Sequence, residues 1–520
     1  MRNSYIKLNG TTRTCADMGP KPCYRWNQGV AGGPRYLGTI AHPSVGVRIP
    51  EILLAGILRA FKRCRVAGGL ELSFGRETAP QRVIESPPGV YDITQGHTGT
   101  SITRYMTMSS SSASKIGASV EIEADHLIVV GSAAKAIKRI SGVHEESRIN
   151  QRELERSLAY NKEEIDEALS TNAVNAFTTD TSDLINLDVD KWDDDAIVRQ
   201  FNHMFTPSER RRLRARYLGK KFTFAAEWGK RYSYRLSEKE VMRLALKFRE
   251  SIRINREIYD YIIRRMRKPF GFEISLDETR ELTREVETLF YLSEWGASGA
   301  RVDFLAPNIG FLKRRDYRGD LEKLRDRVSK QAAIARKFGA LLSIHSGSGT
   351  SPYSGKGRGT YAVLLQATGG ELKYKISGVY MELLFEILAS YPARSPERSL
   401  YDAIFDAVHE YVRKDLESGG SLSSPLVRRQ LQRYDRAVKA GAVTRRSSRA
   451  EFFRFNSFLA LNLRDAAGRR MYREQLVKLY REGAELRRRI DNEVERLTVR
   501  LIRGLHFENN VDKLVGRQLG

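Results

Sequence analysis

The segment FGALLSIHSGSGTSPY (338–353) joins a short apolar run to a polar, glycine-rich loop that carries one histidine, His345. The apolar run predicts a buried strand, and the glycines and serines after it predict a loop. α/β enzymes commonly present a ligand or an acid/base group at such a strand exit, because the strand fixes the backbone and the loop leaves room for a substrate. An ordinary strand and turn would have the same local pattern, so the rest of the chain is needed to choose between the two interpretations.

Short apolar runs and amphipathic stretches alternate on both sides of this segment. The predicted strands lie within residues 119–130, 173–184, 221–228, 231–237, 270–279, 300–310, 338–353, 371–378 and 451–461. Helical spacing occurs between them, in 151–170, 238–267, 280–295, 319–338 and 379–390. Repeated strand–helix units favour a parallel sheet. Because no GxGxxG motif follows a first strand, we predict a (β/α)8 TIM-type barrel rather than a doubly wound open sheet.

Changes in composition along the chain predict three parts. Residues 1–115 are rich in Gly, Ser and Pro and are predicted to be an N-terminal extension, with a helix at 50–63 and a serine-rich loop at 108–115. Residues 116–465 are predicted to form the barrel that carries the site. Residues 466–520 are predicted to be a helical cap, because leucines and isoleucines recur there at helical spacing.

The 520 residues have a formal net charge of +25, which raises the question of a polyanionic partner. The basic runs at 210–221, 262–268 and 445–449 are mixed with acids, and no RNA-recognition or zinc-finger signature accompanies them. Solvated helix faces, a small anionic substrate and weak polyanion binding all remain open. We expect a cytoplasmic protein, because three cysteines without CxxC spacing indicate no disulfide framework and no signal peptide or membrane span is recognisable. An oligomer is possible.

Polar residues collect where the predicted strands end, and in a barrel these ends meet at the active-site mouth. They are Asp125, His126, Asp180, Asp183, Asp277, Glu278, Asn308, His345 and Ser346. Glu278 and His345 predict a divalent-metal site, since carboxylate and imidazole suit Zn, Mn, Co or Ni. Simpler interpretations are a helix N-cap near Glu278, an Asx turn at Asp180 and Asp183, and a hydrogen bond inside the strand exit for His126.

The loop after His345 resembles a phosphate loop but lacks the Walker spacing, since Gly357 rather than Ser or Thr follows Lys356. We predict instead a loop that covers the substrate. Its backbone amides and Lys356 can hold an anion such as a carboxylate.

Four segments resemble, in order and spacing, the tagaturonate epimerase family of hexuronate catabolism. They are TTDTSDL (178–184), ISLDET (274–279), FLAPNIG with DYRGDLEKL (304–324) and ALLSIHSGSG (340–349), and the resemblance extends over about 116–510. It implies a metal-dependent barrel enzyme that interconverts D-tagaturonate and D-fructuronate, with Glu278 and His345 as metal ligands. Lys375 matches the family pattern. A further family histidine falls on Lys373, and because a protonated lysine cannot ligate a metal, a third ligand would have to come from elsewhere.

The implied reaction inverts a carbon whose hydroxyl lies β to the ketone, so retro-aldol cleavage and re-addition is the predicted route. We expect Asp180 or Asp183 to remove the hydroxyl proton, and Lys356 or Lys375 to pair with the substrate carboxylate. Gly349 and Thr350 stand where the family usually has Asp and Lys, which leaves another sugar-acid substrate open. A non-catalytic binding protein without the metal site is the other alternative.

Overall fold

The computed structural model describes residues 6–8, 11–13, 32–87, 96–132, 135–136, 138, 149–465 and 467–514. The chain divides into two units, 1–31 and 32–520. In the first unit, β1 (Ile6–Leu8) and β2 (Thr11–Arg13) form an antiparallel pair. All other described elements belong to the second unit.

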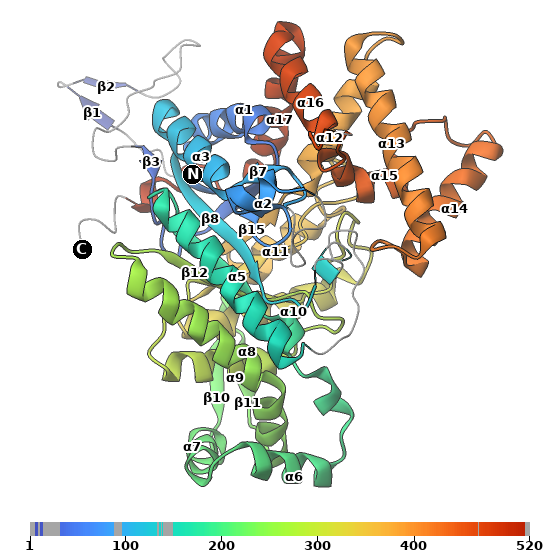
Figure 1. Ribbon diagram of the computed structural model, residues 1–520. Coiled ribbons are helices and arrows are strands. Elements are labelled where there is room, and N and C mark those ends of the chain that lie inside the picture. The colour runs from blue at the N-terminus through green and yellow to red at the C-terminus, as the bar shows by residue number, and fades with distance from the viewer. Residues whose placement is uncertain are drawn as a thin grey trace. The chain divides into compact units, whose positions relative to one another are not determined.

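Eight parallel strands in the second unit close into a barrel, which confirms the predicted fold class (Figure 1). The last strand pairs with the first, and the third pairs with the fourth through an irregular register. In chain order the barrel strands are β4 (His42–Gly46), β5 (Gly68–Ser73), β8 (Ser119–Ile128), β9 (Ala176–Asp180), β12 (Gly271–Leu276), β13 (Phe304–Pro307), β14 (Leu341–Ile344) and β15 (Leu372–Ile376).

A helix follows each barrel strand and covers its outer face. These helices are α1 (Pro50–Arg63), α3 (Ile102–Ile116), α5 (Gln151–Ser170), α8 (Glu238–Arg265), α9 (Glu285–Ala297), α10 (Leu321–Lys337), α11 (Thr360–Thr368) and α12 (Gly378–Ala389). Capping residues in the sequence fix the starts of two of these helices. Asn150 and Glu153 form a capping box on α5, and the side chain of Ser237 caps α8. The strand–helix alternation seen in the sequence is therefore the repeat of the barrel.

The interior of the barrel is charged, whereas barrel interiors are usually filled by branched apolar side chains. On β8 the interior positions are Glu121, Glu123 and Asp125, and the alternate positions, such as Val120 and Ile122, join the apolar core. β15 repeats this pattern with two lysines between apolar residues. Because side chains alternate across a strand, one face packs on the helices while the other fills the barrel with charge.

The predicted boundary at residue 116 is wrong, because β4, β5, α1 and α3 lie before it and complete the barrel. The first strand, HPSVG, has a proline and no clear alternation, so it lacks an ordinary strand signal. The serine-rich stretch 108–115 is helical rather than a loop. It belongs to α3, whose apolar face is buried through Ile102, Tyr105 and Met106.

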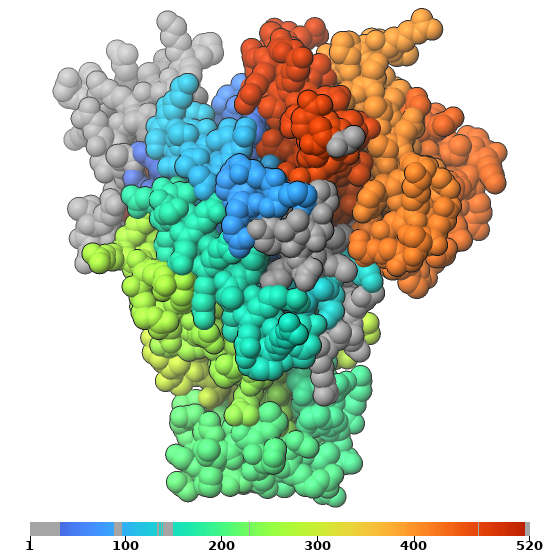
Figure 2. Space-filling model, in the orientation of Figure 1, coloured from blue at the N-terminus to red at the C-terminus, as the bar shows by residue number. Residues whose placement is uncertain are grey.

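Two other predicted strands form a hairpin outside the barrel. β10 (Phe222–Ala225) and β11 (Arg231–Tyr234) pair antiparallel in the insertion before α8. The same insertion holds α6 (Asp194–Met204) and α7 (Pro207–Tyr217), and its green atoms lie at the bottom of the view in Figure 2. An antiparallel hairpin satisfies its own pairing locally, so these strands need no place in the parallel barrel.

The chain after the barrel is helical. It forms α13 (Pro396–Ser418), α14 (Pro425–Lys439), α15 (Glu451–Asn456), α16 (Met471–Glu482) and α17 (Ala484–Gly504). The strand predicted at 451–461 is wrong, because these residues form α15 and a 3₁₀ turn in which four phenylalanines are buried. α17 packs on α1, so the end of the chain covers its first barrel helix.

Shorter elements complete the second unit. They are β3 (Gly33–Pro34), which pairs with β8, β6 (Thr78–Ala79), α2 (Gln81–Glu85) and β7 (Thr100–Ser101). Of the helices that the structure describes, none is long and apolar enough to span a membrane. Cys64 is a buried free thiol, and Cys15 and Cys23 lie outside the described residues.

Candidate active site at the carboxyl ends of the barrel strands

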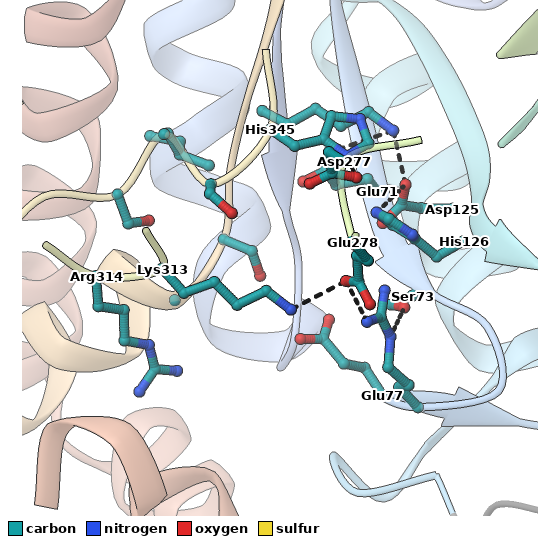
Figure 3. A pocket seen from close by; sticks show the side chains of 18 of the residues that line it. Glu71, Ser73, Glu77, Asp125, His126, Asp277, Glu278, Lys313, Arg314 and His345 are labelled. Atoms are coloured by element: carbon teal, nitrogen blue, oxygen red, sulfur yellow. Dashed lines mark hydrogen bonds and ion pairs between the residues drawn. The ribbon is translucent and has the colours of Figure 1, made fainter. Parts of the chain in front are cut away.

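A cavity of about 130 Å³ lies at the carboxyl ends of the barrel strands (Figure 3). Its lining comes from the exits of seven of the eight strands, as expected for the mouth of a barrel. The residues are Arg48, Glu71, Ser73, Arg76, Glu77, Asp125, His126, Asp277, Glu278, Lys313, Arg314, His345, Ser346, Gly347, Ser348, Lys375, Ile376, Ser377 and Gly378. The predicted gathering of Glu278, His345, Ser346 and Lys375 is therefore found at one cavity.

His345 follows β14 and lies between two carboxylates. Its Nε2 is 2.6 Å from Glu273 Oε1, and its Nδ1 is 3.1 Å from Asp277 Oδ1. Burial opposes the charged imidazole, but the carboxylates of Asp277 and Glu273 outweigh burial and raise the pKa of His345 to about 10. At neutral pH and without a metal ion, His345 is therefore an imidazolium that links two strand ends.

His126 reaches the cavity because β8 is irregular at this point. The pairing of β8 with β9 shifts register between Ala124 and Leu127, and His126 has a positive φ of 48°. Its Nδ1 lies 3.4 Å from Asp180 Oδ2, and its ring centroid is 5.0 Å from that of His345. The irregularity thus places a second histidine beside the one that the sequence singled out.

Glu278 is held by two cations. Arg76 Nη1 is 2.6 Å and Lys313 Nζ is 3.0 Å from Glu278 Oε1, and Figure 3 shows the lysine extending to this carboxylate. Burial disfavours the Arg76 cation, but the carboxylates of Glu278 and Asp180 raise its pKa above the ordinary value. The N-cap alternative for Glu278 does not hold, because the following helix begins at Glu285.

Below the histidines, four buried side chains form what we call the inner charge network: Glu123, Glu273, Lys373 and Lys375. Lys373 Nζ lies 2.8 Å from Glu123 and 2.9 Å from Glu273. Lys375 Nζ lies 2.8 Å from Glu123 and 3.2 Å from Glu273. Burial alone would lower the pKa of Lys373, but the two glutamates raise it above its ordinary value. Lys373 is thus a protonated partner inside the barrel.

Three groups of residues can hold a metal ion within the described part of the chain. In each group, the ligand atoms lie within 4.8 Å of one another. The groups are His126, Asp277 and His345; His126, Asp180 and Glu278; and Glu71, Glu123 and Asp125. The predicted ligands Glu278 and His345 fall in different groups that share His126. Imidazole with carboxylate suits Zn, Mn, Co or Ni, so the chemistry of the side chains fits a divalent ion.

The two predicted proton acceptors lie at the end of β9. Asp180 is fully buried, and its Oδ1 accepts a hydrogen bond of 3.0 Å from the Ser182 amide, as in an Asx turn. Its other oxygen faces His126. Asp183 lies in the next turn and, like Asp180, is not among the described residues that line the cavity.

Asn308 and Lys356 hold loops together. The amide of Asn308 donates to the carbonyl of Thr279 at 2.8 Å. Lys356 Nζ donates to three backbone carbonyls, those of Leu312, Ser346 and Ser348, at 2.6, 2.5 and 3.1 Å. Burial lowers the pKa of Lys356 to about 7. Neither side chain is among the cavity-lining residues described above, so the predicted substrate contacts of Asn308 and Lys356 have no support from this geometry.

Half of the ionisable residues around the cavity were not predicted from the sequence. They are Arg48, Glu71, Arg76, Glu77, Lys313 and Arg314, all of which line the cavity. For Glu71 a signal existed in GGLELS, where a charged residue alternates with apolar ones inside a buried strand, as it does in GFEISL and LKYKI. A charge at every second position of such a strand indicates a polar barrel interior.

The model of the tagaturonate epimerase family matches residues 159–417, about half of the chain, and confirms the resemblance seen in the sequence. The native crystal structure of fructuronate-tagaturonate epimerase UxaE from Cohnella laeviribosi has a TM-score of 0.60 and 18% identity, with 91% of this chain and 83% of that chain covered. The complex of that enzyme with one glycerol has the same TM-score and 20% identity, covering 93% and 83%. Both share the fold. No curated protein sequence matches the chain.

Proposed function

We propose that this chain, a member of the tagaturonate epimerase family, interconverts D-tagaturonate and D-fructuronate with the help of a divalent metal ion. The observation that carries the proposal is the cluster of His126, His345, Asp277 and Glu278 around one cavity at the barrel mouth. Active sites of this fold are built at that end of the strands. The match to the family model supports an isomerase of the epimerase class.

His126, His345 and Asp277 would hold the metal ion in this proposal. His126 supplies the third ligand that the sequence left missing, because Lys373 stands where the family has a histidine and is committed to Glu123 and Glu273. When bound, the ion would supply positive charge that stabilises negative charge developing on the substrate. His345 must give up a proton to become a ligand, so metal binding should release protons.

The residues of the chain then handle the proton. In a retro-aldol step a carboxylate removes the proton of the hydroxyl β to the ketone, and the adjacent carbon–carbon bond breaks to give an aldehyde and an enolate. Rotation of the aldehyde, re-formation of the bond and return of the proton invert the carbon without net oxidation. Of the predicted catalytic carboxylates Asp180, Asp183 and Glu278, only Glu278 lines the cavity, where Arg76 and Lys313 pair with it. We assign the proton transfer to Glu278.

The test is exchange between the two ketohexuronates, followed by proton NMR on purified protein with Mn, Co, Ni or Zn added. We expect His126→Ala, His345→Ala and Glu278→Gln each to lower kcat/KM by at least about 100-fold. The two histidine variants should also lose bound metal, measured by elemental analysis. His409→Ala is the matched control, because His409 lies on α13, outside the cavity, and should leave both readouts unchanged.

The proposal fails if no metal supports exchange in the wild-type protein. It also fails in its metal assignment if Glu278→Gln removes the metal while His345→Ala retains it, since the ligands would then be His126, Asp180 and Glu278. A protein that binds a sugar acid without exchanging it would be the non-catalytic alternative.

One observation favours a second candidate, an epimerase of another sugar acid. At Gly349, where the family usually has Asp, an added Cβ would lie 2.1 Å from the carbonyl oxygen of Gly355 and 2.5 Å from Asp316 Oδ1. The neighbouring loop atoms therefore occupy the space that a side chain at residue 349 would need. Assaying other ketohexuronates in the same way distinguishes this candidate, because a faster exchange of one of them would reassign the substrate.

A further inference from the structure

Two arginines at the outer side of the cavity have N–H groups without acceptors. Arg48 and Arg314 are only 6% and 5% exposed, and both line the cavity. One nitrogen of Arg48 pairs with Glu77, and Arg314 Nε lies 3.7 Å from Glu382. Within the described ranges, no acceptor lies within hydrogen-bonding distance of Arg48 Nε, Arg48 Nη1 or Arg314 Nη1. Buried N–H donors normally have an acceptor, so we expect a ligand to supply one for these three arginine nitrogens.

The start of α12 adds further donors at the same place. Ser377 precedes the helix, its side chain does not cap it, and its buried hydroxyl has no partner among the residues that the structure describes. The first backbone amides of a helix have no acceptor within the helix, and the helix dipole makes this end positive. Ser377 and Gly378 both line the cavity. Helix starts of this kind bind anionic groups.

Gly378 brings Arg314 directly over this helix start. A Cβ added at Gly378 would lie 2.6 Å from Arg314 Nε and 3.0 Å from its Nη2. The guanidinium therefore lies against the first residue of α12, and its charge and the helix amides converge on one position. Figure 3 shows Arg314 on the left of the view, across the cavity from His126.

Around the outer side of the cavity, two carboxylates are each approached by two cations, so positive charge is in excess there. Glu278 is shared by Arg76 and Lys313, and Glu382 is approached by both Arg314 and Arg454, at 3.7 and 2.9 Å. Burial first, and then the charge of Arg48, lower the pKa of Arg314 to about 10, which reflects two cations close together in a buried place. An added anion would relieve both the repulsion and the missing hydrogen bonds.

We propose that Arg48, Arg314, Ser377 and the first turn of α12, together the outer anion subsite, bind the carboxylate of the sugar acid. This inference rests on the proposed function for the identity of the ligand. The carboxylate end of the substrate then lies at the outer anion subsite, and the carbons that react extend toward Glu278 and the two histidines. Lys375, which the sequence offered for this role, is instead occupied by Glu123, Asp125 and Glu273.

The experiment is calorimetric titration of the full chain with D-fructuronate and with D-fructose, which has a hydroxymethyl group in place of the carboxylate. We expect Arg314→Gln and Arg48→Gln each to weaken D-fructuronate binding about tenfold to a hundredfold and to leave D-fructose binding unchanged. Arg315→Gln is the matched control, because Arg315 is only partly buried, does not line the cavity and pairs with Glu451. Gly378→Ala should weaken D-fructuronate binding too, since its methyl group displaces Arg314 without removing a charge.

Several outcomes would overturn the inference. One is equal D-fructuronate affinity in wild type, Arg314→Gln and Arg48→Gln, each shown to be folded by circular dichroism. Another is a preference for inorganic phosphate over D-fructuronate that the same variants abolish, which would assign the subsite to a phosphate group. If wild type binds D-fructuronate through Arg314 but shows no exchange, the epimerase proposal fails and this inference stands. If exchange is normal in wild type, Arg314→Gln and Arg48→Gln alike, the epimerase proposal stands and this inference fails.

Discussion

The inner charge network and the outer anion subsite both contain buried cations, but among the described residues only the first network satisfies all of them. Lys373 and Lys375 each lie within 3.2 Å of oxygens on Glu123 and Glu273. Arg48 and Arg314, equally buried, keep N–H groups without an acceptor among the described residues. A buried charge that is fully paired holds the barrel together, whereas one left incomplete is available to a ligand. Substitutions in the two regions should therefore affect different measurements.

The largest effect on stability should come from Lys373→Met. This change leaves Glu123 and Glu273 buried without one of their two lysines, and breaking a buried ion pair costs about 3–5 kcal/mol. Urea denaturation would measure the free energy of unfolding. The double variant with Glu123→Gln should recover part of the loss. A loss below about 1 kcal/mol in the single variant would contradict the structural role of the network.

Glu121 tests the same interior through pH. It is buried on β8 and accepts a hydrogen bond from the Leu37 amide, and burial raises its pKa to about 8. The folded state thus holds this proton more tightly than the unfolded chain, so stability is lost as pH rises from about 4.5 to about 8. Glu121→Gln should unfold like wild type near pH 4 and be more stable by a few kcal/mol, at about 1.4 kcal/mol per pKa unit, near pH 9. Parallel stability curves for the two proteins would refute this.

Arg314→Gln should affect ligand binding and leave stability nearly unchanged, whereas Lys373→Met should affect stability. Glu382 keeps Arg454 at 2.9 Å, so no carboxylate is left alone, and one of two neighbouring cations is removed. We expect the free energy of unfolding without ligand to change by less than about 1 kcal/mol. D-fructuronate should then raise the melting temperature of wild type more than that of the variant. A large loss of stability without ligand would contradict this prediction and show that Arg314 stabilises the fold, as Lys373 is expected to do.

The smallest effect should come from Arg315→Gln, one residue along the chain. Its side chain is 42% exposed, and its partner Glu451 has a second contact with Arg433. An ion pair that is open to solvent contributes about 0–1 kcal/mol, and this partly exposed pair leaves Glu451 a second partner, so both stability and ligand binding should stay near wild type. Urea denaturation and calorimetry on this variant set the baseline for the other three.

Much of the fold could be predicted from local patterns. Strand–helix alternation identified the barrel from β8 onward, because each strand packs an apolar face on its own helix. It failed for β4 and β5, whose five and six residues contain proline or paired glycines. These segments form strands because they pair with neighbouring strands, and their own residues carry no local pattern that predicts this pairing.

The site shows the same division. His345, Glu278 and Ser346 could be found because they directly follow recognisable strands. Lys356 was predicted as an anion ligand because it lies in a glycine-rich loop, and only the structure shows that its Nζ donates to three backbone carbonyls. His126 was undervalued, because its approach to His345 depends on an irregular pairing between β8 and β9.

The sequence by itself determined a parallel barrel, a histidine at its mouth and the family to which the chain is related. Only the tertiary structure decided which charges are paired. Lys373 and Lys375 pair with the glutamates of β8 and β12, and Glu278 pairs with Arg76 and Lys313. Arg48 and Arg314 keep N–H groups without an acceptor in the part of the chain that the structure describes. The physical reason is range. Alternation and capping act between residues a few positions apart, whereas charges across a barrel meet according to strand order and register, over separations such as the 250 residues between Glu123 and Lys373.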